Sequence, residues 1–72
     1  MLLVYTKPDC VQCRFTIRWL TAHHIDFEQR SALDYLDQLK AQGFRQLPVV
    51  IDPVHDVSWS GFQPTRLAQY LT

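Results

Sequence analysis

The 72-residue sequence lacks net charge, long apolar runs and any recognisable leader. Seven basic residues balance seven acidic ones, so no net field would gather nucleic acid or anionic lipid. No apolar run approaches the roughly 20 residues that a membrane-spanning helix needs. The first apolar run, 2–5, is too short for a secretory signal and has no basic lead or cleavage site. We therefore expect a cytoplasmic protein that binds neither nucleic acid nor membrane.

Cysteine is scarce as well, with only Cys10 and Cys13 in the chain. A small secreted domain that depends on disulfides carries more cysteines at wider spacing. A bridge across so short a loop restricts the unfolded chain by only about 2 kcal/mol. A C-x-x-C pair after a strand and before a helix is instead typical of thiol–disulfide exchange in a reducing compartment. The pair is predicted to carry chemistry rather than to hold the fold together.

The composition is that of a folded protein, because 47% of the residues are hydrophobic and 19% are charged. This is too apolar for a disordered chain. The length leaves room for one core, so we expect a single domain over residues 1–72.

Apolar periodicity and turn residues predict seven elements along the chain. In order they are a strand at 2–6, a helix from 10 to about 22, a strand at 25–29, a helix at about 31–42, strands at 47–51 and 54–59, and a helix from 64 to about 71. The second strand must be reached by a crossover connection, which gives a βαβ unit.

The predicted helix ends carry capping signals. Asp9 with Gln12, and Ser31 with Asp34, match the capping-box spacing. Gly43 is placed to end the second helix in a left-handed conformation. These patterns predict Asp9 as the N-cap of the first helix.

The element order β-α-β-α-β-β-α, with the cysteine pair at the first strand-to-helix junction, resembles the thioredoxin fold in its minimal, glutaredoxin-like form. That resemblance implies an α/β fold with a four-stranded mixed sheet flanked by three helices. Three motifs narrow it: Cys10-Val11-Gln12-Cys13, Leu47-Pro48-Val49-Val50 and Trp59-Ser60-Gly61-Phe62-Gln63-Pro64. Together they are similar to the motifs of NrdH-redoxins, the glutaredoxin-sized electron donors of class Ib ribonucleotide reductase.

Cys10 is predicted to be the exposed nucleophile and Cys13 the more buried, resolving thiol. With Cys10 at the first helical position, one helical turn places the two Cα atoms about 5 to 6 Å apart, within disulfide range. Free backbone N–H groups, the helix dipole and Lys7 favour a thiolate at Cys10. Asp9 opposes it.

The resemblance implies a partner-binding surface around the cysteines, made by Lys7, Val11, Gln12, Leu47, Pro48, Trp59, Ser60, Gly61, Phe62 and Gln63. Leu47-Pro48 resembles the cis-proline turn that faces the dithiol in this fold.

Several of these positions have a second, structural interpretation. Gln12 either caps the helix with Asp9 or ties the dithiol to the 59–64 segment, and Val11 either meets a partner or packs at the helix start. Trp59 is either a core residue or, by the resemblance, a contact surface beside the cysteines. Phe62 is more often core.

The chain departs from the family pattern at two positions. Gln63 stands where the family commonly has arginine, and Thr65 stands where an acidic residue commonly follows the proline. The departures remove charges from the expected docking surface.

Three alternatives are weighed against an NrdH-like function. Zinc binding is disfavoured because His23 and His24 lie about 15 Å from Cys13 along the same helix. A redox-sensing binding module has no support beyond the fact that folds do not fix functions. A glutathione-dependent glutaredoxin shares Lys7, Pro48 and the dithiol, but the start of the last helix lacks the acidic residue that typically holds the glutathione ammonium group.

The resemblance thus implies an electron carrier without a bound cofactor or metal. It would accept electrons from thioredoxin reductase and pass them through Cys10 and Cys13 to class Ib ribonucleotide reductase.

Overall fold

Four strands form one mixed sheet in the order β2-β1-β3-β4. The computed structural model describes residues 1–71. The strands are β1 (Leu2–Thr6), β2 (Phe27–Ser31), β3 (Val49–Asp52) and β4 (Val57–Ser60). The central strand β1 is parallel to β2 and antiparallel to β3, and β4 is antiparallel to β3. The expected four-stranded mixed sheet is confirmed.

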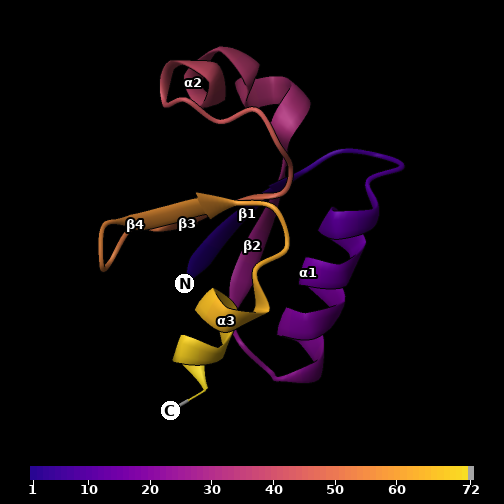
Figure 1. Ribbon diagram of the computed structural model, residues 1–72, viewed down its shortest axis with the longest axis vertical. Coiled ribbons are helices and arrows are strands. Elements are labelled where there is room, and N and C mark those ends of the chain that lie inside the picture. Colours follow the sequence, from indigo (N-terminus) through magenta and orange to yellow (C-terminus); the bar gives the residue numbers. More distant parts are fainter. Residues whose placement is uncertain (72) are drawn as a thin grey trace.

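The helices lie on both faces of this sheet. They are α1 (Val11–Ala22), α2 (Leu36–Ala41) preceded by the short 3-10 turn η1 (Ala32–Tyr35), and α3 (Pro64–Leu67) followed by η2 (Ala68–Tyr70). In Figure 1, α1 and α3 lie below the sheet and α2 lies above it. The chain therefore has three layers, as the thioredoxin-like fold requires.

Each face of the sheet has its own apolar cluster. On the α1 and α3 side the buried residues are Leu2, Val4, Leu20, Val50, Trp59 and Leu67. On the α2 side they are Tyr5, Ala32, Leu39 and Val49. Val4 and Tyr5 are neighbours on β1 and point to opposite faces, as alternation along a strand dictates.

Three predicted strands began two or three residues too early. Ile25 belongs to the connection after α1, because its N–H is bonded to the carbonyl of Leu20, and β2 starts at Phe27. The 47–48 turn precedes β3, and a turn over residues 53–56 precedes β4. Periodicity places the elements but does not place their ends.

The predicted capping boxes do not form at either helix start, although Ser31 is the N-cap residue of η1 as its position predicted. Asp9 has a left-handed backbone, with a φ of 60°, and Cys10 is the N-cap of α1 rather than its first residue. Ser31 precedes η1 without a side-chain cap hydrogen bond. At α1 the sulfur of Cys10 accepts the N–H of Cys13, which fills the role that the Asp9 carboxylate was expected to have. The glycine prediction holds, since Gly43 follows α2 with a φ of 88°.

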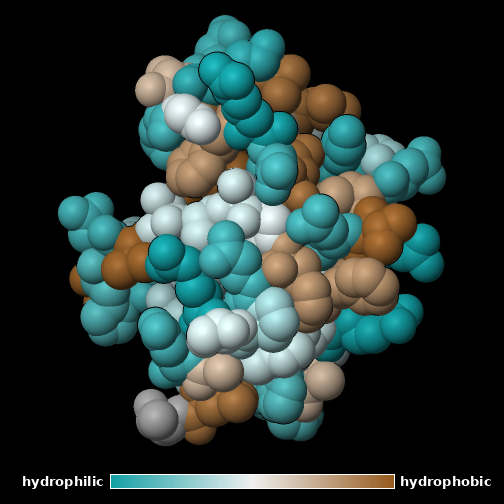
Figure 2. Space-filling model, viewed as in Figure 1, coloured by the Kyte–Doolittle hydropathy of each residue, from teal (hydrophilic) through white to brown (hydrophobic). Residues whose placement is uncertain are grey.

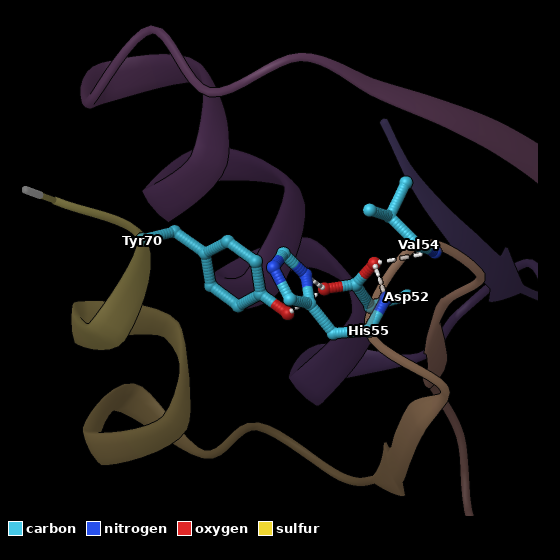
Figure 3. A network of polar contacts seen from close by, with 4 residues as sticks. All are labelled: Asp52, Val54, His55 and Tyr70. Atoms are coloured by element: carbon cyan, nitrogen blue, oxygen red, sulfur yellow. Dashed lines mark hydrogen bonds and ion pairs between the residues drawn. The ribbon is translucent and has the colours of Figure 1, made fainter.

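A buried carboxylate ties the β3–β4 turn to the C-terminal residues (Figure 3). Asp52 accepts the backbone N–H groups of Val54 and His55 at 3.0 and 3.2 Å. Its other oxygen accepts the Tyr70 hydroxyl at 2.5 Å and lies 2.7 Å from His55 Nδ1. The hydrogen bond from Tyr70 lowers the pKa of Asp52 to about 2. Burial, followed by the Asp52 carboxylate, raises the pKa of Tyr70 to about 12.

We predict that Tyr70→Phe lowers the free energy of unfolding by about 1 to 3 kcal/mol at neutral pH, because a buried carboxylate loses a hydrogen bond. The pKa of Asp52 is lower in the folded state than its ordinary value of 3.8. The contribution of the ionised Asp52 to the free energy of unfolding is therefore complete above about pH 4 and is lost as the pH falls from about 4 to 2. Urea unfolding of both proteins across this range measures it. A difference between them that stays constant down to pH 2 would contradict the assignment.

Candidate active site

The two cysteines lie at the turn between β1 and α1 and form a disulfide. Their Cα atoms are 5.2 Å apart, within the expected range. Cys13 is only 3% exposed, whereas Cys10 is half-buried. Cys10 is therefore the sulfur that an incoming group reaches first, in agreement with its predicted role as nucleophile.

The start of α1 places one backbone N–H donor at the Cys10 sulfur. The N–H of Cys13 lies 3.2 Å from Cys10 Sγ, and the N–H of Arg14 is bonded to the Cys10 carbonyl. Lys7 lines the same hollow as Cys10. A backbone donor, the positive end of the helix dipole and a nearby ammonium group all favour a thiolate once the disulfide is reduced.

The 47–48 turn faces the cysteines from β3. The Leu47–Pro48 peptide bond is cis, as the resemblance implied. The Leu47 carbonyl oxygen lies 3.8 Å from Cys10 Sγ. The Pro48 carbonyl accepts the N–H of Gly61 at 2.8 Å. Pro48 is thereby joined to the segment that follows β4.

Gln12 joins α1 to the same segment. Its Oε1 accepts the N–H of Phe62 at 2.9 Å. Of the two interpretations of Gln12, the structure thus has the one that ties the dithiol to residues 59–64. The fit is close at Gly61, where φ is 79° and an added Cβ would lie 3.0 Å from Gln12 Oε1.

Ser60 and Gln63 complete this loop through their own contacts. The side-chain N–H of Gln63 donates to the Ser60 carbonyl at 2.8 Å. Its side-chain oxygen accepts from Arg66 at 3.1 Å. Gln63 thus holds the turn that leads into α3.

Trp59 is a core residue, which corrects its assignment to the partner-binding surface. It is 4% exposed and belongs to the cluster on the α1 and α3 side. Val50 is its cross-strand partner, and the guanidinium of Arg66 lies 5.7 Å from the ring centroid. Its indole N–H has no hydrogen-bond partner among residues 1–71. The indole supports the loop from beneath and presents no face to a partner.

An apolar patch lies on the outer face of α1. Val11 is 58% exposed and Phe15 is 46% exposed. The ring of Phe15 packs 5.8 Å from that of the half-buried Phe62. Figure 2 shows hydrophobic side chains over the first half of α1, with hydrophilic ones around them. The exposure of Val11 supports its interpretation as a contact residue. Phe15 lies one turn after Val11 on the same face of α1.

A groove of about 630 Å³ lies on the other side of Cys10, toward α2. Its lining is mainly apolar and includes Leu33, Leu36, Phe44 and Leu47. Leu33 and Leu36 are 57% and 42% exposed, whereas Leu39 is buried. Leu33 lies in η1 and Leu36 begins α2, so both leucines are accessible from the groove.

No cluster of three or more metal-ligating side chains occurs within the part of the chain that the structure describes. The redox-active group is the Cys10–Cys13 disulfide itself.

The sequence matches the glutaredoxin family over residues 2–55. It is 47% identical over 69 residues to the glutaredoxin-like protein NrdH of Escherichia coli K12, an alignment that covers 92% of this chain and 83% of that protein. The chain belongs to the NrdH-redoxin family. NrdH of Lactococcus lactis IL1403 is 33% identical over 72 residues, with 96% and 97% of the two chains covered. The solved structure of E. coli NrdH-redoxin superposes with a TM-score of 0.88 at 43% identity and covers 96% of this chain and 92% of that one.

Membership in this family, together with the C-x-x-C disulfide, makes the protein a thiol–disulfide oxidoreductase. We expect the reduced protein to attack a target disulfide with the thiolate of Cys10, the more exposed of the two cysteines. The inner thiol then displaces the target as a dithiol, and the intramolecular disulfide re-forms. Two electrons and two protons pass to the target in the cycle.

We predict that Cys13→Ser accumulates a stable mixed disulfide on Cys10, because the resolving thiol is missing. Intact-protein mass spectrometry after incubation with a disulfide substrate detects the adduct. In Cys10→Ser the remaining thiol is buried, so we expect at least a tenfold slower adduct formation. An adduct that forms on Cys13 of Cys10→Ser as fast as on Cys10 would reverse the two assignments.

We predict that Gly61→Ala lowers the free energy of unfolding more than Gly43→Ala does. Both glycines have a positive φ, so both substitutions cost about 1 kcal/mol of backbone strain. An added Cβ meets nothing within 4 Å at position 43, whereas at position 61 it crowds Gln12. Urea unfolding compares the two variants, and adding Gln12→Ala should reduce the excess loss at position 61. Equal losses would show that the contact between Gln12 and the loop is loose.

Proposed function

We propose that this protein is a cytoplasmic dithiol electron carrier that is reduced by thioredoxin reductase and that reduces class Ib ribonucleotide reductase. It works without a bound cofactor, because the electrons are stored in Cys10 and Cys13. No helix within residues 1–71 is long and apolar enough to cross a membrane.

The observation that carries the choice of reductant is the start of α3. A glutathione-dependent glutaredoxin needs an acidic group there to pair with the γ-glutamyl ammonium. Here the first turn of α3 begins at Pro64 and contains no acidic side chain. The loop in front of it is closed by Gln12 and Gln63. Both glutamines are neutral, so a bound ammonium group would lose water without gaining a charged partner.

A property of a relative supports the same choice. The E. coli NrdH-redoxin has a thioredoxin-like activity profile within a glutaredoxin-like protein. Its fold and most of its length correspond to those of this chain. A thioredoxin-like profile is expected of a carrier that draws electrons from a flavoprotein reductase rather than from glutathione.

The surface around Cys10 suits protein partners. Val11 and Phe15 are exposed on one side of Cys10, and Leu33 and Leu36 are exposed along the groove on its other side. Exposed apolar side chains this close to a reactive sulfur are typical of a protein contact surface. We assign Lys7, Leu47, Ser60, Phe62 and Gln63 to the same surface. Pro48 and Gly61 are buried, which corrects their assignment to partner contact and leaves them the role of shaping the turns around Cys10.

The alternative function is that of a glutathione-dependent glutaredoxin. It stays open because the groove beside Cys10 is lined by Lys7 and Leu47, and this groove does not distinguish the two reductants. That arrangement can accept an extended cysteine-containing peptide whatever reductant supplies the electrons.

The choice of reductant is tested by supplying NADPH with one of two reducing systems, thioredoxin reductase or glutathione plus glutathione reductase. We expect thioredoxin reductase to sustain reduction of a disulfide substrate, with glutathione plus glutathione reductase at least tenfold slower at equal protein concentration. NADPH consumption at 340 nm is the measurement, and the Cys10→Ser/Cys13→Ser protein is the control. Turnover with glutathione alone would favour the glutaredoxin alternative.

The acceptor is tested with the purified class Ib reductase. We expect ribonucleotide reduction to depend on this protein in the presence of thioredoxin reductase and NADPH. The double cysteine variant should not support it.

A further inference from the structure

The basic residues are unevenly distributed, although the net charge is zero. Six of the seven line three hollows that share Lys7, two of which also include a cysteine: Lys7, Arg14, Arg18, Arg30, Lys40 and Arg45. No aspartate or glutamate of the described chain lines any of these hollows. Basic residues that are separated in the sequence are thus brought together by folding around Lys7 and the two cysteines.

One of the hollows lies against Cys13 and has the largest share of basic residues in its lining. It measures about 340 Å³, and its lining includes Lys7, Arg14 and Arg18. We call these three residues the basic surface. Thr6 and Gln29 also line the hollow, and the Gln29 amide donates to the Thr6 hydroxyl at 3.0 Å.

The charges of the basic surface are not neutralised within the molecule. In residues 1–71 the ion pairs are Arg30 with Glu28 and His55 with Asp52. Asp9 is exposed in the turn before Cys10, and its negative charge reduces the positive charge of the basic surface. It does not line the hollow or pair with one of the three cations. The local charge is therefore positive.

The basic surface adjoins the apolar patch on α1. Arg14 and Arg18 are four residues apart and share one side of the helix, while Val11 and Phe15 share the side next to it. A partner lying across the outer face of α1 would meet both sides at once. The cysteine pair lies at the N-terminal end of that face.

We propose that the basic surface of Lys7, Arg14 and Arg18 docks acidic side chains that flank the reactive disulfide of a protein partner. The inference deepens the proposed function and rests on it for the exchange of thiols at Cys10. It adds the chemistry of the partner, which is an acidic segment whose apolar side chains meet Val11 and Phe15.

Exposed charges of this kind act mainly on the rate of encounter and on selectivity between partners. Their effect falls as salt shortens the range of the field, from about 30 Å at 0.01 M to about 3 Å at 1 M. The signature is thus a charge preference that disappears at high ionic strength while the thiol chemistry persists.

The test uses two short peptides that each contain one internal disulfide, flanked by glutamates in one peptide and by lysines in the other. Reduced protein is mixed with each, and acid quenching followed by chromatography measures the formation of peptide dithiol. The protein loses two electrons and forms its disulfide while the peptide gains them, so no other reagent takes part. At about 0.01 M salt we expect the glutamate peptide to react about fivefold faster, and at about 1 M we expect equal rates.

Arg14→Gln/Arg18→Gln should abolish most of this preference and leave the rates at high salt unchanged. Glutamine keeps a good helix propensity. Gln38→Glu/Gln69→Glu is the matched control, because it also lowers the net charge by two at exposed positions of α2 and η2. We expect the control to retain the preference. Equal loss in both variants, or no preference in the unaltered protein, would overturn the proposal.

Failure of the proposed function gives a different result. If neither peptide is reduced, the exchange itself is absent. Serine versions of both peptides then decide the docking question with the oxidised protein. Amide NMR shifts at residues 7, 14 and 18 with the glutamate peptide alone support the basic surface, and their absence contradicts it.

Discussion

The position of the central strand β1 determines where the chemistry takes place. β1 is bonded to β2 on one side and to β3 on the other, and Val4 in its middle is fully buried. A strand held on both edges cannot shift register without exposing its apolar side chains. The turn at its carboxyl end is thereby fixed, and this turn presents Cys10 at the start of α1. The pairing of β1 within the sheet therefore also fixes the location of the reactive sulfur.

Two polar contacts convert this turn into a site with defined walls. Pro48 accepts the N–H of Gly61, and Gln12 accepts the N–H of Phe62. Consecutive backbone donors that would otherwise need water are thus paired with Pro48, just before β3, and with Gln12 on α1. The loop after β4 is thereby held beside the dithiol, with Cys13 buried and Cys10 half-buried. The order of the proposed exchange steps depends on this difference in accessibility.

The sequence was sufficient for the elements and their order, and for the identity of the cysteine pair. These depend on apolar periodicity and on a short motif, which are local features. The cap of α1 was not predictable in this way, because Asp9 and Cys10 compete for one helix start and the left-handed backbone at Asp9 decides between them. Trp59 shows a different failure. A motif states which residues are present, but the pairing of Trp59 with Val50 decides which face of the sheet the indole joins.

The acidic and basic side chains are separated in space, although the net charge of the chain is zero. Acidic side chains line hollows beside the β3–β4 turn and around η1 and α2, whereas the hollows beside the cysteines are lined by lysine and arginine. A neutral molecule with such a division has a dipole, which turns the molecule in the field of a charged partner. An acidic partner would meet the cysteine end first. Because apolar contacts act only within a few ångströms, orientation by charge would precede them and would raise the fraction of encounters in which Cys10 faces a disulfide.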